Sequence, residues 1–233
     1  MRQPERCGRG RSPRSAAVSA VMGVATWLAC GTAAQAQGRR VVEFFAGTAY
    51  NFPTPLTIRQ EGEPDVRLSA RYRTKPWQDS PYYAYRFGYT DRDGRAWEAE
   101  LVHHKLYLEE NLPPAVQRFE VTHGYNLVTV NRAVIGATGT MWRIGVGAVI
   151  GHPEATVRGK PTTGRGGFFD RGYFLSGPTL QLALGRRFPD PHGFFVSAEG
   201  KLTASWARLP IRDGTAVTPN VALHGLLGVG YAY

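Results

Sequence analysis

Large apolar residues alternate with small or polar residues through most of the chain that follows residue 36. The alternation is clearest at the C-terminus, in residues 221–233. One face of an extended strand there carries Val221, Leu223, Leu227, Val229, Tyr231 and Tyr233. The other face carries Asn220, Ala222, His224, Gly228, Gly230 and Ala232. A period of two is that of a β-strand, so this pattern predicts a strand with one large apolar face.

The same alternation predicts further strands along the chain. They cover residues 41–51, 56–60, 66–74, 82–90, 97–107, 119–128, 142–150, 180–184 and 194–206. In most of them the charged residues share the face opposite the large apolar ones, as in a transmembrane barrel that turns its apolar face to lipid. An open sheet in lipid would leave backbone groups at its edges without partners. The pattern therefore predicts an all-β fold, a closed antiparallel transmembrane β-barrel.

Connection lengths suggest how many strands cross the membrane. Short connections at 91–94, 131–139 and 188–193 alternate with longer segments. If the last strand descends to a periplasmic C-terminus, residues 61–64 form a periplasmic turn and 56–60 a short descending strand, which gives ten strands. A barrel of eight strands, with residues 37–63 as a lead-in, is the alternative, because 56–60 is shorter than the roughly 9–11 residues of a tilted spanning strand.

The first 36 residues have the pattern of a secretory signal peptide. Arginines precede an apolar run at 16–29, and Ala34-Gln35-Ala36 forms a small-x-small cleavage site. The sequence thus divides into a signal peptide, 1–36, and a barrel domain, 37–233. Both cysteines, Cys7 and Cys30, lie in the signal peptide, so the mature chain offers no disulfide and no cysteine ligand for a metal.

The end of the chain also carries a family signature. Gly228, Tyr231 and Tyr233 resemble the terminal assembly signal of outer-membrane β-barrel proteins of Gram-negative bacteria, although Leu226 departs from its usual polar residue. The resemblance implies secretion to the periplasm, assembly by the barrel-assembly machinery and residence in the outer membrane. Expected partners are outer-membrane lipids and lipopolysaccharide. Basic residues are scattered among the strands, so no nucleic-acid partner is expected, and neither is a cofactor.

Charged residues on the polar faces are expected to pair inside the barrel, because an unpaired buried charge is costly. This predicted interior network consists of Glu43, Arg67, Arg71, Arg86, Glu98, Glu100, Arg118, Glu120, Arg143, Glu199 and Lys201. Such a network favours a structural or surface-interaction role over an enzymatic one. A small-solute pore is one alternative.

The other alternative is a lipid-modifying hydrolase acting on lipid A or phospholipid. Its candidate catalytic residues are His103, His104, Glu120 and His123. A bulge near residues 101–102 would turn the polar residues of 97–107 inward. With a loop at 109–114, His103 is expected opposite Glu120. A histidine beside a carboxylate suits a general base, but no serine follows a histidine in a His-x-Ser motif. His152 and Glu154 are two ligands only, so no metal site is predicted.

Overall fold

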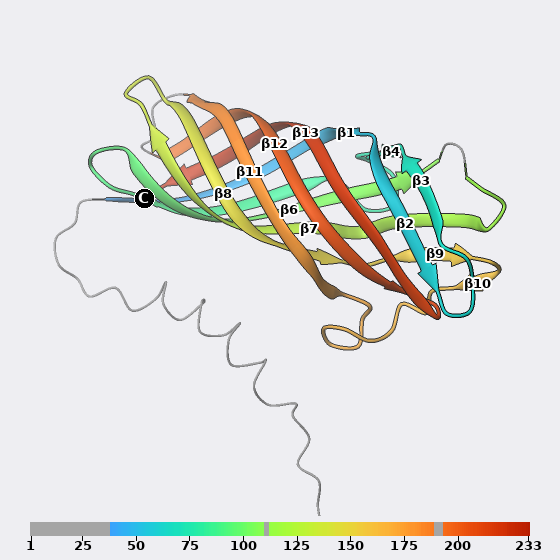
Figure 1. Ribbon diagram of the computed structural model, residues 1–233. Coiled ribbons are helices and arrows are strands. Elements are labelled where there is room, and N and C mark those ends of the chain that lie inside the picture. The colour runs from blue at the N-terminus through green and yellow to red at the C-terminus, as the bar shows by residue number, and fades with distance from the viewer. Residues whose placement is uncertain (1–37, 110–111, 189–192) are drawn as a thin grey trace, which may run out of the picture. The chain divides into compact units, whose positions relative to one another are not determined.

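The computed structural model describes residues 38–109, 112–188 and 193–233 (Figure 1). The predicted signal peptide, 1–36, lies outside them. The strands are β1 (Arg39–Phe52), β2 (Thr54–Gln60), β3 (Val66–Ala70), β4 (Tyr72–Arg73), β5 (Tyr83–Thr90), β6 (Arg95–Leu108), β7 (Val116–Ile135), β8 (Thr140–Gly151), β9 (Glu154–Val157), β10 (Lys160–Pro161), β11 (Phe174–Phe188), β12 (Gly193–Ile211) and β13 (Gly214–Ala232). The described part of the chain contains no helix with the length and hydrophobicity needed to cross a membrane.

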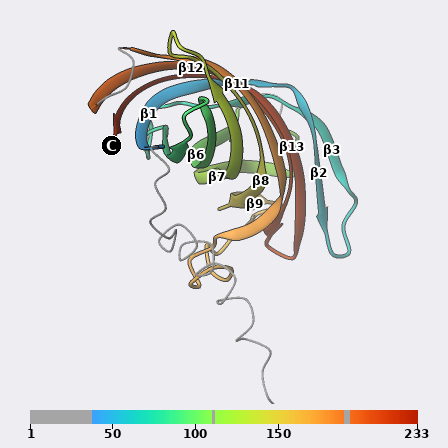
Figure 2. The same ribbon diagram turned by 90° about the vertical axis from the view of Figure 1, so that its left-hand side faces the viewer.

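Eight of these strands pair in a closed ring. Going round it, β1 pairs with β5, β5 with β6, β6 with β7, β7 with β8, β8 with β11, β11 with β12, β12 with β13, and β13 with β1. Every pairing between strands is antiparallel, and Figure 2 shows the strands curving around a common interior. The prediction of an all-β antiparallel fold is confirmed.

The count of ten spanning strands is not confirmed, because two predicted strands continue others. β2 follows β1 along the same neighbour, β13, after a break at Pro53, which has no N–H to donate to the ladder. β3, β4 and β5 likewise follow one another, with β4 and β5 both beside β6. The eight-strand alternative treated residues 37–63 as a lead-in outside the barrel, and this is also wrong. β1 is a member of the ring, because it pairs with β13 on one side and β5 on the other.

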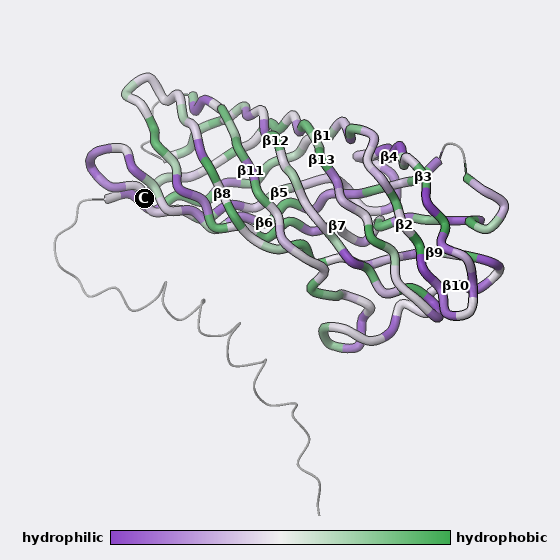
Figure 3. Tube along the Cα trace, viewed as in Figure 1, coloured by the Kyte–Doolittle hydropathy of each residue, from purple (hydrophilic) through white to green (hydrophobic). Residues whose placement is uncertain are grey.

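The half of the ring around Tyr233, at the left in Figure 1, has its apolar side chains outside. This C-terminal half exposes Phe87, Trp97, Trp142, Ile144, Val146, Leu182, Leu184, Phe194, Leu227 and Val229. Its interior holds charged and amide side chains instead, as the alternation in the sequence predicts. Figure 3 shows how apolar and polar residues alternate along these strands.

The opposite half, around β2, β3 and β9, has the reverse polarity, and we call it the distal half. Its interior is a cluster of buried apolar side chains that includes Leu56, Ile58, Tyr72, Phe119, Tyr125 and Leu209. β7 shows the change within one strand: the inward side chains are polar Asn131 and Thr129, then apolar Leu127 and Tyr125. An apolar core with polar residues outside is the arrangement of a protein surrounded by water.

Candidate active site on the outer face of the ring

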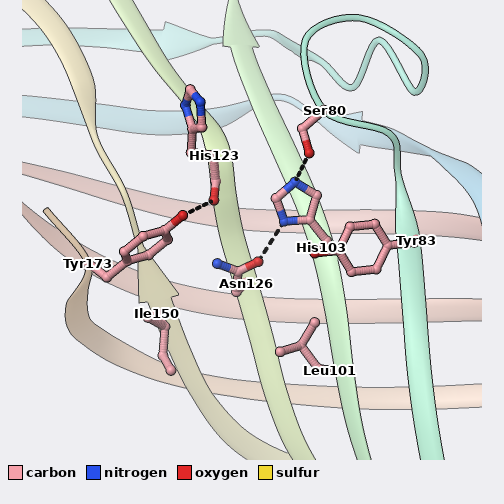
Figure 4. Close-up of a pocket in the computed structure, with 8 residues that line it drawn as sticks. All are labelled: Ser80, Tyr83, Leu101, His103, His123, Asn126, Ile150 and Tyr173. Carbon is pink, nitrogen blue, oxygen red and sulfur yellow. Dashed lines mark hydrogen bonds between the residues drawn. The ribbon is translucent and has the colours of Figure 1, made fainter. Parts of the chain in front are cut away.

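A serine, a histidine and an asparagine form a hydrogen-bonded row on the outer face of the ring. Ser80 Oγ lies 3.0 Å from His103 Nε2, and His103 Nδ1 lies 2.8 Å from Asn126 Oδ1 (Figure 4). With Nδ1 protonated and donating to Asn126, Nε2 is free to accept the Ser80 hydroxyl proton. This is the relation of nucleophile, base and orienting group in serine hydrolases.

The register of three strands places these side chains together. Tyr83 of β5 pairs with His103 of β6, which pairs with Asn126 of β7, so the three form one cross-strand row. The Tyr83 ring stacks on the His103 ring, with centroids 4.8 Å apart and planes 12° from parallel. The imidazole is therefore held between an aromatic face, a serine and an asparagine.

Ser80 comes from the segment between β4 and β5, which leans on the outer face of β6. Lys105 Nζ donates to the backbone carbonyls of Gln78 and Ser80, and Tyr107 Oη donates to Asp79 Oδ2 at 2.7 Å. These bonds hold the backbone of the serine and do not involve its hydroxyl. The Ser80 hydroxyl is thus free to hydrogen-bond His103.

Gly124 makes room for the asparagine. The register between β6 and β7 shifts just after His104, which leaves a bulge in β7 that contains Gly124. Its φ is +128°, in the region that favours glycine, and a Cβ there would collide with the side-chain amide of Asn126. Any larger residue would displace Asn126 from His103.

An open hollow of about 250 Å³ lies beside the row. It is lined by Ser80, Tyr83, Leu101, His103, His123, Asn126, Ile150 and Tyr173. Figure 4 shows Leu101 and Ile150 on one side of Asn126 and the two histidines on the other. The hollow therefore has an apolar part and a polar part, and it lies where the outer surface changes from apolar to polar.

A second polar cluster borders the hollow. The bulge of β7 presents His123, while His152 and Glu154 lie at the break between β8 and β9, beside it in the sheet. His123 Nδ1 contacts Glu154 Oε1, and Thr122 Oγ1 donates to the same oxygen at 2.7 Å. Arg118 Nη2 lies 2.9 Å from the other oxygen, Oε2.

The pKa values of two groups in this cluster, Glu154 and His152, are shifted from their usual values. Burial raises the pKa of Glu154, but hydrogen bonds from Thr122 and His123 and the charge of Arg118 outweigh it, so the pKa lies below its usual value. Burial and the charge of His123 lower the pKa of His152. These shifts favour the charged form of Glu154 and the neutral form of His152.

Inside the ring, the structure brings together seven of the residues predicted to form an interior network. Glu43, Arg86, Glu98, Glu100, Arg143, Glu199 and Lys201 are all buried. Arg86 Nη1 lies 3.2 Å from Glu43 and Nη2 lies 2.9 Å from Glu199. Arg143 Nε lies 2.8 Å from Glu98, and Lys201 contacts Glu100. Each of these charges thus has at least one opposite charge as a neighbour.

Arg187 belongs to the same network, although it was not among the residues predicted for it. Its Nη2 lies 2.9 Å from Glu43 Oε2. Arg187 follows Gln181, Ala183 and Gly185 in a period of two, so the alternation of β11 already placed it on the inward face. With it, four buried carboxylates face four buried cationic side chains among the described residues.

Four residues predicted for the interior lie on the exterior instead. Arg67, Arg71 and Arg118 are exposed and Glu120 is partly exposed. Arg67 pairs with Asp65, and Arg118 pairs with Glu120. All four belong to the distal half, where the interior is apolar and polar side chains point outward.

The four candidate catalytic residues separate in the structure. His103 and His123 line the hollow, whereas His104 points inward and bonds Asn51 Oδ1 at 2.9 Å. His103 does not lie opposite Glu120: it pairs with Asn126, and Glu120 pairs with Tyr107. The register is continuous through residues 101–102 and shifts only after His104, where the bulge lies in β7. Ser80 and Asn126 were not among the predicted catalytic residues. Ser80 is distant from any histidine in the sequence. Asn126 lies on the polar face of its predicted strand, and that face was assigned to the interior.

Comparisons with known proteins concern the fold. No family model matches the chain, and no curated protein matches its sequence. Among solved structures it is similar to Ail, the attachment invasion locus protein of Yersinia pestis, at 12% identity and a TM-score of 0.41, covering 84% of this chain and 99% of Ail. It is also similar to Neisserial surface protein A (8%, 0.39, 83% and 96%) and to the outer membrane protein OprG from Pseudomonas aeruginosa (10%, 0.43, 85% and 97%).

Proposed function

We propose that the protein is an outer-membrane serine hydrolase that cleaves acyl esters of lipids in the outer leaflet. The observation that carries this proposal is the row Ser80–His103–Asn126 on the outer face of the ring, beside an open hollow. A non-enzymatic structural role, favoured by the sequence, gives no reason for a serine, a histidine and an asparagine to meet there.

The two polarities of the ring support its placement in a membrane. The exposed apolar side chains of the C-terminal half suit contact with lipid tails, and the polar exterior of the distal half suits water. The hollow lies between the two, where lipid tails meet headgroups. Acyl esters are found in that same region of a bilayer, so Leu101 and Ile150 face the acyl chain and the catalytic row faces the ester.

The row can carry out ester hydrolysis in two steps. His103 Nε2 takes the proton of Ser80 while Oγ attacks the ester carbonyl, and the proton then passes to the departing alcohol. Water, deprotonated by the same nitrogen, hydrolyses the acyl-serine and releases the fatty acid. Asn126 keeps the imidazole in the required tautomer throughout.

The buried ion pairs argue against a solute pore. Four carboxylates and four cations meet across the interior of the C-terminal half, where Arg86 and Arg143 are almost fully buried. A ring of eight strands has an interior that side chains can fill. We expect little conductance through this protein in planar bilayers.

The test is to mix the purified, refolded protein with vesicles of diacyl phospholipid and, separately, with lipopolysaccharide. Mass spectrometry of the lipids is expected to show lyso-phospholipid or lipid A that lacks one ester-linked chain, together with free fatty acid. A fluorophosphonate should add its mass to one serine, in a peptide that contains Ser80. If both lipids stay intact and no serine is labelled, the hydrolase proposal is wrong.

Membrane assembly gives a separate prediction. The final residues of β13 pair with β1 at Val41↔Ala232 and with β12 at Phe194↔Tyr231, so they close the ring. Deletion of residues 231–233 is expected to prevent assembly, and the unheated protein should lose the faster gel migration that folded barrels show. The matched control is Phe169→Ala, which removes an aromatic ring that is 93% exposed in a connection. Normal outer-membrane assembly of the truncated protein would contradict the assembly role of the terminus.

A further inference from the structure

The cluster of His123, His152 and Glu154 has the composition of a metal site. The ligand atoms of the three side chains all lie within 4.8 Å of one another. Ligands of a tetrahedral Zn²⁺ are about 2.0–2.2 Å from the ion, which puts them roughly 3.4 Å apart. Small side-chain rotations would therefore bring these atoms to binding distance.

An unpaired nitrogen supports this interpretation. His152 Nδ1 is buried and has no hydrogen-bond partner, and the His152 and His123 rings lie 5.3 Å apart between centroids. A buried polar atom without a hydrogen-bond partner lowers the stability of the fold, because it has lost its contact with water and gained nothing in return. A metal ion between the rings would give this nitrogen the partner that the protein side chains do not provide.

The surroundings of the cluster already orient its ligands. Thr122 donates to Glu154 Oε1, and Arg118 holds Oε2, so the carboxylate is fixed with Oε1 toward His123. Tyr173 packs against His152, with ring centroids 4.8 Å apart. Neighbours that orient metal ligands in this way strengthen binding, and their loss costs on the order of 10- to 100-fold in affinity.

We propose that His123, His152 and Glu154 bind one divalent transition-metal ion of the zinc class at the rim of the hollow. Two imidazoles and one carboxylate are the protein ligands of many three-ligand zinc sites, which leave a further position open. Because the site borders the hollow, that position is accessible from the headgroup region. The inference does not depend on Ser80, since none of the three ligands belongs to the catalytic row.

The experiment measures Zn²⁺ and Co²⁺ binding by the full-length mature protein, without a histidine tag, refolded in detergent without lipopolysaccharide. Wild type is expected to bind one Zn²⁺, and Co²⁺ to give the visible absorption of a four-coordinate site. His152→Asn and Glu154→Gln should each weaken binding by at least tenfold, and Thr122→Ala by a similar factor or less. His103→Gln is the matched control, because it removes a histidine of the same hollow and should leave the affinity unchanged.

Folding of each variant is checked by the migration of unheated protein, so a lost signal can be assigned to the site. Equal affinity in wild type, His152→Asn and Glu154→Gln would overturn the proposal, as would the absence of a stoichiometric ion in wild type. The readout is binding alone. A failed metal experiment therefore leaves the hydrolase proposal standing, and failed lipid cleavage leaves the metal site standing.

Discussion

Ser80→Ala is expected to abolish lipid ester cleavage while leaving the barrel folded. Ser80 Oγ bonds His103, and the backbone of its segment is held separately by Lys105, so alanine removes the nucleophile and little else. Loss of the nucleophile or of its base typically lowers kcat by on the order of 10⁴- to 10⁶-fold. The rate of fatty-acid release from phospholipid or lipopolysaccharide measures this loss.

The other members of the row should rank in order of their roles. His103→Ala is expected to match Ser80→Ala, because the hydroxyl then has no base. Asn126→Ala should lose less, about 10²- to 10⁴-fold, since the imidazole remains but its orientation is not held. Ser69→Ala is the control, because Ser69 is an exposed serine of β3 away from the hollow. Full activity of Ser80→Ala would show that the row is not the active site.

Glu100→Ala is expected to lower the free energy of unfolding by about 3–5 kcal/mol, because it leaves buried cations without their counter-charge. Glu100 accepts hydrogen bonds from Arg86 at 3.2 Å, from Asn131 at 2.9 Å and from Gln181 at 3.1 Å, and it contacts Lys201. Its side chain is fully buried, so water cannot replace these partners. Equilibrium unfolding by urea in detergent micelles measures the change.

Glu120→Ala provides the comparison. Glu120 also pairs with an arginine, but the Arg118 side chain is 50% exposed and solvent screens the pair. Its loss is expected to cost less than about 1 kcal/mol, the usual range for surface ion pairs. Equal destabilisation by the two substitutions would mean that the network inside the ring contributes no more than a surface pair.

The sequence predicts the all-β fold better than it predicts the number of spanning strands. Period-two alternation identified the extended segments, because that period depends only on local backbone geometry. The number of strands depends on what happens at interruptions. Pro53 interrupts one long strand without reversing it, and the segment 74–82 does the same between β4 and β5. Nothing local distinguishes such an interruption from a turn.

The site could be predicted only in part, because alternation separates two faces without saying which one meets lipid, water or the interior. The charged side chains of the C-terminal half share one face of their strands, and the structure brings them together in the interior. Asn126 shares its face with Glu120, and both point outward because the interior becomes apolar above Thr129. Ser80 lies in an irregular segment, so only the tertiary contacts of Lys105 and Tyr107 bring it to His103.

The reversal of polarity along β7 also determines the depth at which the ring lies in a bilayer. Sliding the ring inward by two residues, about 6.6 Å of strand, would draw Asn126 and exposed His123 toward hydrocarbon, and the same slide outward would lift Val128 and Val130 toward water. Either shift is unfavourable, so the ring is held at one depth and Ser80 with it. For the proposed hydrolase, the choice among several esters is then expected to depend on their distance from the bilayer surface, and a thinner or thicker bilayer should change that choice without any change in the protein.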